Sequence, residues 1–306
     1  MLGSRVTSAF VGVSLIALVA VSCKAPGEEA RPAGEGIGSG ARETGSSVPA
    51  PPPDTWRREV VAGHSLEGRE IRAIVLGDGP CILLAIAVIH GDEPAGERLV
   101  RFLAEELEER PERLGDRCAV LVPVANPDGL ARDQRGNARG VDINRNFPTS
   151  NRTRARAHGE TGFSEPESRA LGDLIAEYAP ERIVSVHQPL ACVDYDGPAE
   201  KLAWAMARRG PLPVRKLGAR SGSLGSYAGI ELGIPIVTLE LPRDLDGMSD
   251  EELWREFGEM LLAAVDYPDR YPRADSRGRT EVRGCGTGAQ GSPVSRWKAQ
   301  SAIPVP

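Results

Sequence analysis

Two histidines and two glutamates in this 306-residue chain have the types and the spacing of a metal-dependent hydrolytic site. His90 and Glu93 begin and end a His-Gly-Asp-Glu motif, His187 stands apart from it, and Glu240 lies in a Thr-Leu-Glu-Leu motif. Two histidines and one glutamate leave a catalytic zinc ion with an open position for water. A further glutamate nearby would take the proton from that water. The pattern therefore predicts metal-assisted hydrolysis.

Three of these side chains directly follow apolar runs that are typical of buried strands. The runs are residues 81–89, 182–186 and 234–239, and they are followed by His90, His187 and Glu240. In an open α/β sheet, the site lies just beyond the carboxyl ends of the strands. We therefore expect the three runs to deliver their polar residues to one place.

A polar, glycine-rich stretch, residues 126–148, lies between the metal motif and His187. A long ordered loop inside a compact domain is typically functional. Guanidinium groups bind carboxylates through two parallel hydrogen bonds, so arginines in such a loop are suited to an anionic ligand. The loop contains Arg132, Arg135, Arg139, Asn144 and Arg145. We expect several of these side chains to converge on an anionic group.

Taken together, the motifs resemble those of the M14-class zinc carboxypeptidases, from about residue 60 to about residue 267. Within that class, the chain is most similar to the murein peptide amidase A group, which cuts the γ-D-glutamyl–diaminopimelate bond of cell-wall peptides. The motifs that carry the resemblance are HGDE, NPDG, R-x-N-x-x-GVDINRNFP, SEPESRAL, HQPL-x-x-VDYDGPA, GSLGSYAG and TLELP.

The resemblance implies a role for each residue at the centre of the site. His90, Glu93 and His187 become the ligands of one zinc ion per chain, and Glu240 becomes the general base. Arg135 would polarise the scissile carbonyl and stabilise the oxyanion. Only the register of the family motif favours it over Arg132.

Further residues are implied at the edge of the site. Asn144 and Arg145 would bind a substrate carboxylate, and Asp142 would hydrogen-bond the nitrogen of His90 that does not face the metal, which fixes the tautomer. Tyr227 lies in the segment from which these enzymes bring a mobile tyrosine over the substrate, although its spacing differs from theirs. Asp194 is a candidate for the distal ammonium group of diaminopimelate, with Asp196 as the alternative. From the residues alone, Cys192 and Asp194 either line the pocket or shape the strand's exit.

The first 53 residues predict export. Arg5 precedes an apolar run at residues 9–21 that is too short to span a membrane, and small residues then lead to Cys23. This ending resembles a bacterial lipoprotein signal. We therefore expect residues 1–23 to be a signal peptide and Cys23 to carry a lipid anchor that holds the enzyme at a membrane of the cell envelope, facing the periplasm or the exterior. Ordinary cleavage to a soluble exported enzyme is the alternative.

The rest of the chain divides by composition. Residues 24–53 are rich in Pro, Gly and Ala and predict a disordered tether. Residues 54–271 have the size of one α/β domain, and residues 272–306 predict a disordered tail. The formal net charge of −6 argues against a general nucleic-acid binder. Cys81 and Cys118 both open apolar runs, so they are candidates for neighbours in a sheet, as free thiols or as a disulfide.

Within the domain, strand-like runs alternate with helical patterns. The runs are residues 71–76, 81–89, 118–124, 182–186 and 234–239. Ser164-Glu-Pro-Glu and Ser249-Asp-Glu-Glu predict capping boxes at two helix starts, and residues 97–107 are amphipathic. Such alternation indicates a mainly parallel sheet covered on both faces. The resemblance implies the same three-layer α/β/α fold with a mixed central sheet.

These observations predict a zinc-dependent amide hydrolase that acts on short peptides with a free carboxylate, and a muropeptide is the favoured substrate. The alternative is a general metallocarboxypeptidase that removes C-terminal residues. A third hypothesis is a non-catalytic lipoprotein that binds wall peptides, and the presence of every ligand and of Glu240 counts against it.

Overall fold

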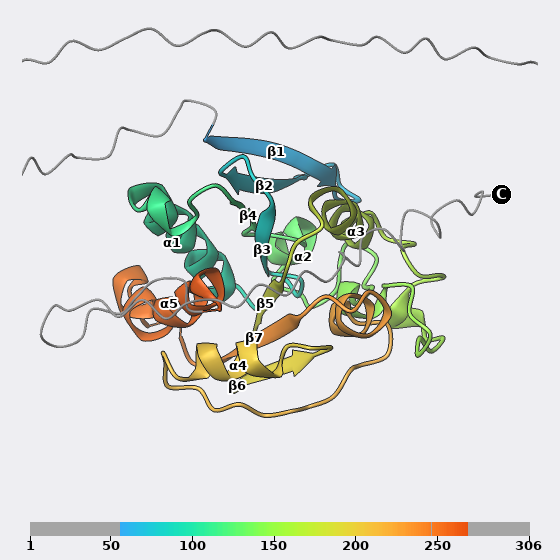
Figure 1. The fold of residues 1–306 in the computed structure, drawn as a ribbon. Coiled ribbons are helices and arrows are strands. Elements are labelled where there is room, and N and C mark those ends of the chain that lie inside the picture. Colours follow the sequence, from blue (N-terminus) through green and yellow to red (C-terminus); the bar gives the residue numbers. More distant parts are fainter. Residues whose placement is uncertain (1–55, 246, 269–306) are drawn as a thin grey trace, which may run out of the picture. The chain divides into compact units, whose positions relative to one another are not determined.

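The computed structural model describes residues 56–245 and 247–268, which form one α/β domain around a seven-stranded sheet (Figure 1). The predicted signal peptide, lipidated Cys23, tether and tail lie outside the described residues. The strand order is β1-β2-β4-β3-β5-β7-β6. The strands are β1 (Arg57–His64), β2 (Glu70–Leu76), β3 (Cys81–Ala87), β4 (Cys118–Val122), β5 (Ile183–His187), β6 (Leu190–Asp196) and β7 (Ile236–Pro242).

The sheet is mixed, and its parallel strands are the central four. β3 runs parallel to β4 and to β5, and β5 runs parallel to β7. β1, β2 and β6 are antiparallel additions at the two sides. The central parallel strands are buried on both faces and therefore read as continuous apolar runs, which made them predictable. The edge strands β1 and β6 carry charged residues, and the sequence did not predict them.

Helices cover both faces of the sheet (Figure 1), as the three-layer expectation requires. One face packs against α1 (Ala95–Glu109), α4 (Glu200–Ala207) and α5 (Asp250–Asp266). The other packs against α3 (Pro166–Tyr178) and the π-helix η4 (Gly225–Glu231). The connections contain the short helices η1 (Pro111–Arg113), α2 (Pro127–Ala131), η2 (Ile143–Arg145) and η3 (Arg156–His158). None of the described helices is long and apolar enough to cross a membrane.

One of the two predicted capping boxes is present. Ser249 Oγ accepts a hydrogen bond from Glu252 N, and the Glu252 side chain accepts one from Ser249 N, so α5 begins as its sequence indicates. The prediction for Ser164 was wrong, because Glu165 is the residue that precedes α3 and it makes no side-chain cap. Ser164 instead donates to Glu165 and accepts from Asn146 at 2.8 Å, which ties the long loop to the start of α3.

The order of the strands opens a crevice at the carboxyl ends of β3 and β5. From β3 the chain crosses to β4 on one side, and it then returns to β5 on the other side of β3. Ligands in such sheets bind where the direction of the connections reverses. At the opposite ends of the strands, Cys81 and Cys118 are register partners in β3 and β4, and both are buried free thiols.

Candidate active site

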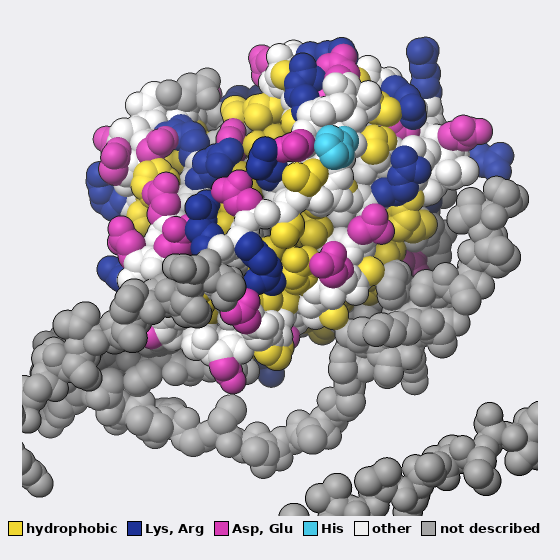
Figure 2. Space-filling model, turned by 90° about the horizontal axis from the view of Figure 1, so that it is seen from above, with side chains coloured by type: hydrophobic (Ala, Val, Ile, Leu, Met, Phe, Trp, Pro, Cys, Tyr) yellow, Lys and Arg dark blue, Asp and Glu magenta, His cyan; other side chains and the backbone are white. Residues whose placement is uncertain are grey.

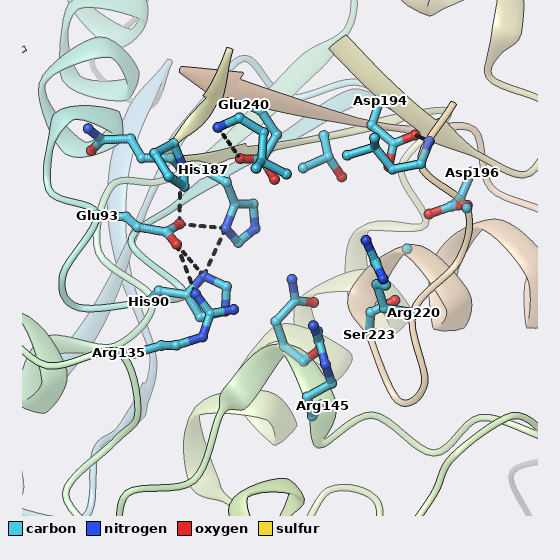
Figure 3. Close-up of a pocket in the computed structure, with 18 residues that line it drawn as sticks. His90, Glu93, Arg135, Arg145, His187, Asp194, Asp196, Arg220, Ser223 and Glu240 are labelled. Carbon is cyan, nitrogen blue, oxygen red and sulfur yellow. Dashed lines mark hydrogen bonds and ion pairs between the residues drawn. The ribbon is translucent and has the colours of Figure 1, made fainter. Parts of the chain in front are cut away.

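Neighbouring strands bring the predicted metal ligands and the predicted general base together at this crevice (Figure 3). His187 is the last residue of β5, and its register partner in β7 is Glu240. His90 and Glu93 follow β3, after a residue with an unusual backbone, Val88 at φ +51°. A β-branched residue rarely takes such a conformation, and strain of this kind clusters at functional sites. The strand β3 therefore ends at Ala87, two residues earlier than the apolar run suggested.

The three candidate ligands face one another at short distances. Glu93 lies between the histidines, with Oε1 2.9 Å from His90 Nδ1 and Oε2 2.8 Å from His187 Nδ1. The two Nδ1 atoms are 3.1 Å apart. Ligand nitrogens of one tetrahedral zinc ion, each about 2.05 Å from it, would be ~3.3 Å apart. All three side chains are buried, and their ligand atoms lie within 4.8 Å of one another. The residues present therefore fit a zinc ion.

The remaining ring nitrogens have partners that fix the two imidazoles. His90 Nε2 lies 3.0 Å from Asp142 Oδ1, which is the contact that the sequence implied for Asp142. His187 Nε2 lies 2.9 Å from Ser185 Oγ. Because each Nε2 is held by an oxygen, Nδ1 is the nitrogen available to a metal. Ser185 was not predicted, although its place two residues before His187 puts it on the same face of β5.

The carboxylates around the histidines are held in the ionised form. Burial alone would raise the pKa of Asp142, but the hydrogen bond with His90 and the charge of Arg135 keep it well below its usual range. Burial likewise opposes ionisation of Glu93, and contacts with His187 and His90 lower its pKa. An ionised Glu93 is the form that binds a cation.

Glu240 has the opposite electrostatic character. Its side chain is half-buried at the edge of the cavity, and burial raises its pKa above the ordinary value. Its Oε2 accepts one weak hydrogen bond, from Leu190 N at 3.4 Å. A carboxylate with a raised pKa and few partners is well suited to accept a proton from a reacting group.

Arg135 reaches the ligands, whereas Arg132 does not. Arg135 Nη1 lies 3.2 Å from Glu93 Oε1, and its Nε lies 3.1 Å from Asp142 Oδ2. Arg132 pairs with Glu67 on the outer side of the loop and does not line the cavity. Arg135 therefore lies beside the metal ligands, where it faces a group bound opposite them.

Buried amides hold the arginine-bearing loop in place. Asn126, Asn137 and Asn146 are fully buried, and each bridges the loop to another segment. Asn126 donates to Ile89 O at 3.2 Å and caps α2, and Asn137 donates to Glu165 and Glu167 at 2.8 and 3.1 Å. These hydrogen bonds replace the regular ladder that such a stretch lacks. They explain how so polar a segment is ordered inside the domain.

A glycine pair brings this loop against the metal motif. A Cβ atom on Gly91 would lie 2.0 Å from the backbone carbon of Gly129. Gly91 belongs to the His-Gly-Asp-Glu motif, and Gly129 belongs to the Asn-Pro-Asp-Gly motif. The two motifs are therefore in direct backbone contact, and a side chain at Gly91 would separate them.

The cavity has a volume of about 270 Å³ and extends from the metal ligands to a second group of charged residues (Figure 3). We call this second group the distal end. It consists of Arg145, Asp194, Asp196, Arg220 and Ser223. Asp194 accepts a hydrogen bond from Leu217 N at 2.8 Å, and Asp196 pairs with Lys216 at 3.1 Å. Asp194 thus lines the pocket, while Cys192 is buried and does not.

The other predicted substrate-binding residues are divided between the cavity and the core. Asn144 and Arg145 both line the cavity, and Asn144 Oδ1 accepts from Leu224 N at 2.9 Å. Burial lowers the pKa of Arg145, and the charges of Arg135 and Arg220 act in the same direction. The structure corrects the expectation for Tyr227, whose ring does not line the cavity.

Tyr227 belongs to the apolar layer between α3 and the sheet. Its ring packs 5.6 Å from that of Phe147 and 5.3 Å from that of Phe163. Only 6% of the residue is exposed, and burial raises its pKa to about 12. The π-helix η4 places the tyrosine on its inner side, among apolar residues.

The sequence analysis missed two basic residues of the distal end. Arg220 lines the cavity directly, and Lys216 stands behind Asp196. Both come from residues 208–221 of the connection between α4 and η4, which precede the GSLGSYAG motif and show no periodicity. No signal in the sequence indicated that this connection folds over the pocket.

Comparison with known proteins agrees with this site. The family model described as zinc carboxypeptidase (Peptidase_M14) matches residues 52–195. The chain is 35% identical to murein peptide amidase A of Escherichia coli K12 over 177 residues, which cover 52% of this chain and 70% of that protein. It is also 34% identical to the human carboxypeptidase N catalytic chain over 116 residues, but these cover only 29% of this chain and 25% of the relative.

Solved structures give the same result. The crystal structure of the murein-tripeptide amidase MpaA of Escherichia coli O157 matches with a TM-score of 0.54 and 27% identity, covering 74% of this chain and 95% of that chain. Bovine thrombin-activatable fibrinolysis inhibitor, at 18% identity and a TM-score of 0.57, shares the fold.

The chain belongs to the zinc carboxypeptidase family and is a hydrolase. The family, the fold class and the zinc cofactor predicted from the sequence are thereby confirmed.

Proposed function

We propose that this protein is a murein peptide amidase that cleaves the bond between γ-D-glutamate and meso-diaminopimelate. The similarity to murein peptide amidase A, which extends over 70% of that relative, is the observation that carries the proposal. The distal end of the cavity supports it, because its acidic and basic side chains suit a substrate whose side chain carries charges of both signs. A pocket that binds apolar side chains would instead be lined mostly by apolar groups.

In this proposal, His90, Glu93 and His187 would hold the zinc ion, whose chemistry when bound would be Lewis acidity and the activation of a water molecule. Glu240 receives the proton of that water and later delivers it to the leaving amine. Arg135 stabilises the negative charge that develops on the scissile carbonyl oxygen. Arg145, with Asn144 beside it, binds the carboxylate next to the scissile bond and fixes the register of the peptide.

Asp142 and Ser185 act through the histidines. With Nδ1 directed at the metal, each Nε2 carries the ring proton and donates it, and the Asp142 and Ser185 oxygens accept it. Asp142 also holds Arg135 in place. Asp194 is the proposed partner of the distal ammonium group of diaminopimelate.

The second candidate function is that of a general metallocarboxypeptidase. The family assignment and the similarity to carboxypeptidase N support it, since Arg145 would hold any C-terminal carboxylate. A third, non-catalytic function as a peptide-binding lipoprotein is not favoured, because the metal ligands and Glu240 lie together in one site.

We also propose that the enzyme works in the cell envelope, attached to a membrane through a lipid on Cys23. The apolar run at residues 9–21 and the small residues before Cys23 support this proposal. Mass spectrometry of the protein purified from bacterial membranes tests it. A diacylglyceryl group on Cys23 is expected, and an unmodified N-terminus after another cleavage site would overturn it.

Product analysis tests the proposed activity. The zinc-loaded full chain is incubated with L-alanyl-γ-D-glutamyl-meso-diaminopimelate and, separately, with an ordinary peptide that ends in a free L-residue. Mass spectrometry follows the products, and Glu240→Gln serves as the blank. Release of diaminopimelate by the wild type alone is the expected result. Cleavage of the ordinary peptide only would establish the carboxypeptidase, and cleavage of neither by the zinc-bound protein would reject both.

A further inference from the structure

Two arginines in the cavity have no counter-ion among the described residues. The Arg145 side chain donates to the backbone carbonyl of Asn144, and neither it nor Arg220 is in an ion pair with a described residue. Arg135, in contrast, is satisfied by Glu93 and Asp142. Arg145 is half-buried and Arg220 is exposed at the mouth of the cavity, and the charge of each opposes the other, so a ligand with negative charge would relieve the repulsion.

The two acidic residues of the distal end differ in whether a cation of the protein pairs with them. Lys216 lies 3.1 Å from Asp196 Oδ1 and is held there by the carbonyl and the ring of Tyr195, 4.3 Å from the ring centroid. Asp196 is therefore neutralised within the protein. Asp194 has no such cation, because its only described hydrogen bond comes from Leu217 N.

The charges left for a ligand are thus one negative and two positive. Asp194 supplies the negative charge, and Arg145 and Arg220 supply the positive ones. Figure 3 shows Arg220 on the same side of the cavity as Asp194 and Asp196, away from His90 and Glu93, with its guanidinium group directed into the open space. A ligand that fits carries one ammonium and two carboxylate groups on the side of the scissile bond that lies over the distal end.

A diaminopimelate residue in γ-glutamyl linkage has this set of charges. One of its amino groups is in the scissile amide, which leaves one ammonium and two carboxylates. We propose that Arg220 binds the distal carboxylate of diaminopimelate, while Asp194 binds the ammonium on the same carbon, so that Arg220 selects diaminopimelate over lysine. This assignment rests on the proposed function. Lysine has no distal carboxylate and would leave Arg220 unpaired.

The test compares two peptides that differ only in that carboxylate. The zinc-loaded full chain is assayed with L-alanyl-γ-D-glutamyl-meso-diaminopimelate and with L-alanyl-γ-D-glutamyl-L-lysine. Loss of one charge-assisted pair typically changes an equilibrium by about 10- to 100-fold. We expect the wild type to prefer diaminopimelate in kcat/KM by at least about that range, the ratio to fall toward one in Arg220→Gln, and Arg220→Lys to restore part of it.

A binding experiment gives a second readout that does not depend on turnover. In the Glu240→Gln background, calorimetry compares free meso-diaminopimelate with free L-lysine, with and without Arg220→Gln. We expect the difference in Kd between the two amino acids to disappear when Arg220 is changed. Arg215→Gln is the matched control, because Arg215 is exposed in the same connection and does not line the cavity. It is expected to keep the preference.

The outcomes separate this inference from the proposed function. Equal cleavage of both peptides by the wild type would overturn the role of Arg220 and leave the amidase intact. An equal loss on both peptides in Arg220→Gln would also overturn it, since Arg220 would then serve an anion common to them, such as the α-carboxylate of D-glutamate. If the wild type cleaves neither peptide, the proposed function fails, and the calorimetric difference alone decides the assignment of Arg220.

Discussion

The two ends of the cavity are built in different ways. At the metal end, His187 and Glu240 belong to adjacent parallel strands, and His90 and Glu93 directly follow a third. At the distal end, Asp194 and Asp196 come from the edge strand β6, and Arg220 comes from an irregular connection. The first set is fixed by the centre of the sheet and the second by its margin.

This difference separates reaction chemistry from substrate choice. Groups that act on a reacting bond need positions accurate to a fraction of an ångström, which rigid central strands provide. Groups that recognise a side chain vary between relatives, and margins and connections tolerate such variation. We therefore expect substitutions at the metal end to affect all substrates alike and substitutions at the distal end to change the preference among them.

The largest effect is expected from Glu240→Gln. The variant loses the group that accepts the proton, so kcat should fall by about 10³-fold, on every peptide that the enzyme cleaves. Zinc content, measured by inductively coupled plasma mass spectrometry, should stay at one ion per chain, because Glu240 is not one of the three candidate zinc ligands. A variant that lost activity on one peptide only would contradict the division between the two ends.

Arg145→Gln tests the residue of the distal end that we assign to the carboxylate next to the scissile bond. The residue lines the cavity and has no ion-pair partner among the described residues, so a substrate carboxylate is its expected ligand. Steady-state kinetics should show a fall in kcat/KM of ~100-fold, mostly through KM. Arg132→Gln is the matched control, since Arg132 belongs to the same loop and pairs with Glu67. Equal losses in the two variants would argue against a specific contact.

Asp142→Asn probes the support of the metal end. The substitution keeps the shape of the side chain and removes the charge that faces His90 Nε2 at 3.0 Å. Zinc affinity, measured by competition with a chelator, should weaken by about 10- to 100-fold. Asp133→Asn, an exposed change in the same loop, should leave the affinity as it is. An unchanged affinity in Asp142→Asn would show that Arg135, rather than His90, is the partner that matters.

The smallest effect concerns stability and its dependence on pH. Asp128 is the aspartate of the Asn-Pro-Asp-Gly motif and is fully buried. Burial would raise its pKa, but hydrogen bonds from Ser65, Arg69 and Glu67 N lower it overall. Asp128→Asn should therefore reduce the free energy of unfolding by about 2 kcal/mol at pH 7.

The sign of the pH dependence follows from the lowered pKa. An aspartate in the unfolded chain titrates near pH ~3.9. Because the folded-state pKa is lower, the contribution of Asp128 is complete above that value and is lost as the pH falls through the folded-state pKa. Urea unfolding of the wild type and of Asp128→Asn should differ most near neutral pH and converge in acid. A difference that grew in acid would mean that Asp128 does not stabilise the fold as an anion.

The sequence predicted the centre of this molecule better than its margins. Buried parallel strands are apolar along their whole length, so residues 81–89 and 182–186 were recognisable, and so were the polar residues that end them. Strand β6 mixes apolar residues with two buried aspartates, and this composition is typical of a polar loop. The boundary error at β3 has a local cause, because Val88 and Ile89 are apolar and buried but Val88 has left the strand conformation.

The directions of several side chains were the other feature that the sequence did not predict. Tyr227 and Arg220 lie seven residues apart around one connection, yet the tyrosine points into the apolar layer and the arginine into the cavity. Spacing along the chain does not determine direction in a π-helix or in an irregular segment. The choice between Arg132 and Arg135 had the same origin, since both follow the same turn and only their partners differ.

The sequence by itself determined the family, the strand ends that carry the metal ligands, and the set of side chains from which a zinc hydrolase is built. It did so because those features depend on local patterns, namely apolar runs and short motifs. The tertiary structure alone decided which nitrogen of each histidine faces the metal, which arginine joins Glu93, and which charges remain free at the distal end. These depend on contacts between segments far apart in the chain, and such contacts exist only after the chain has folded.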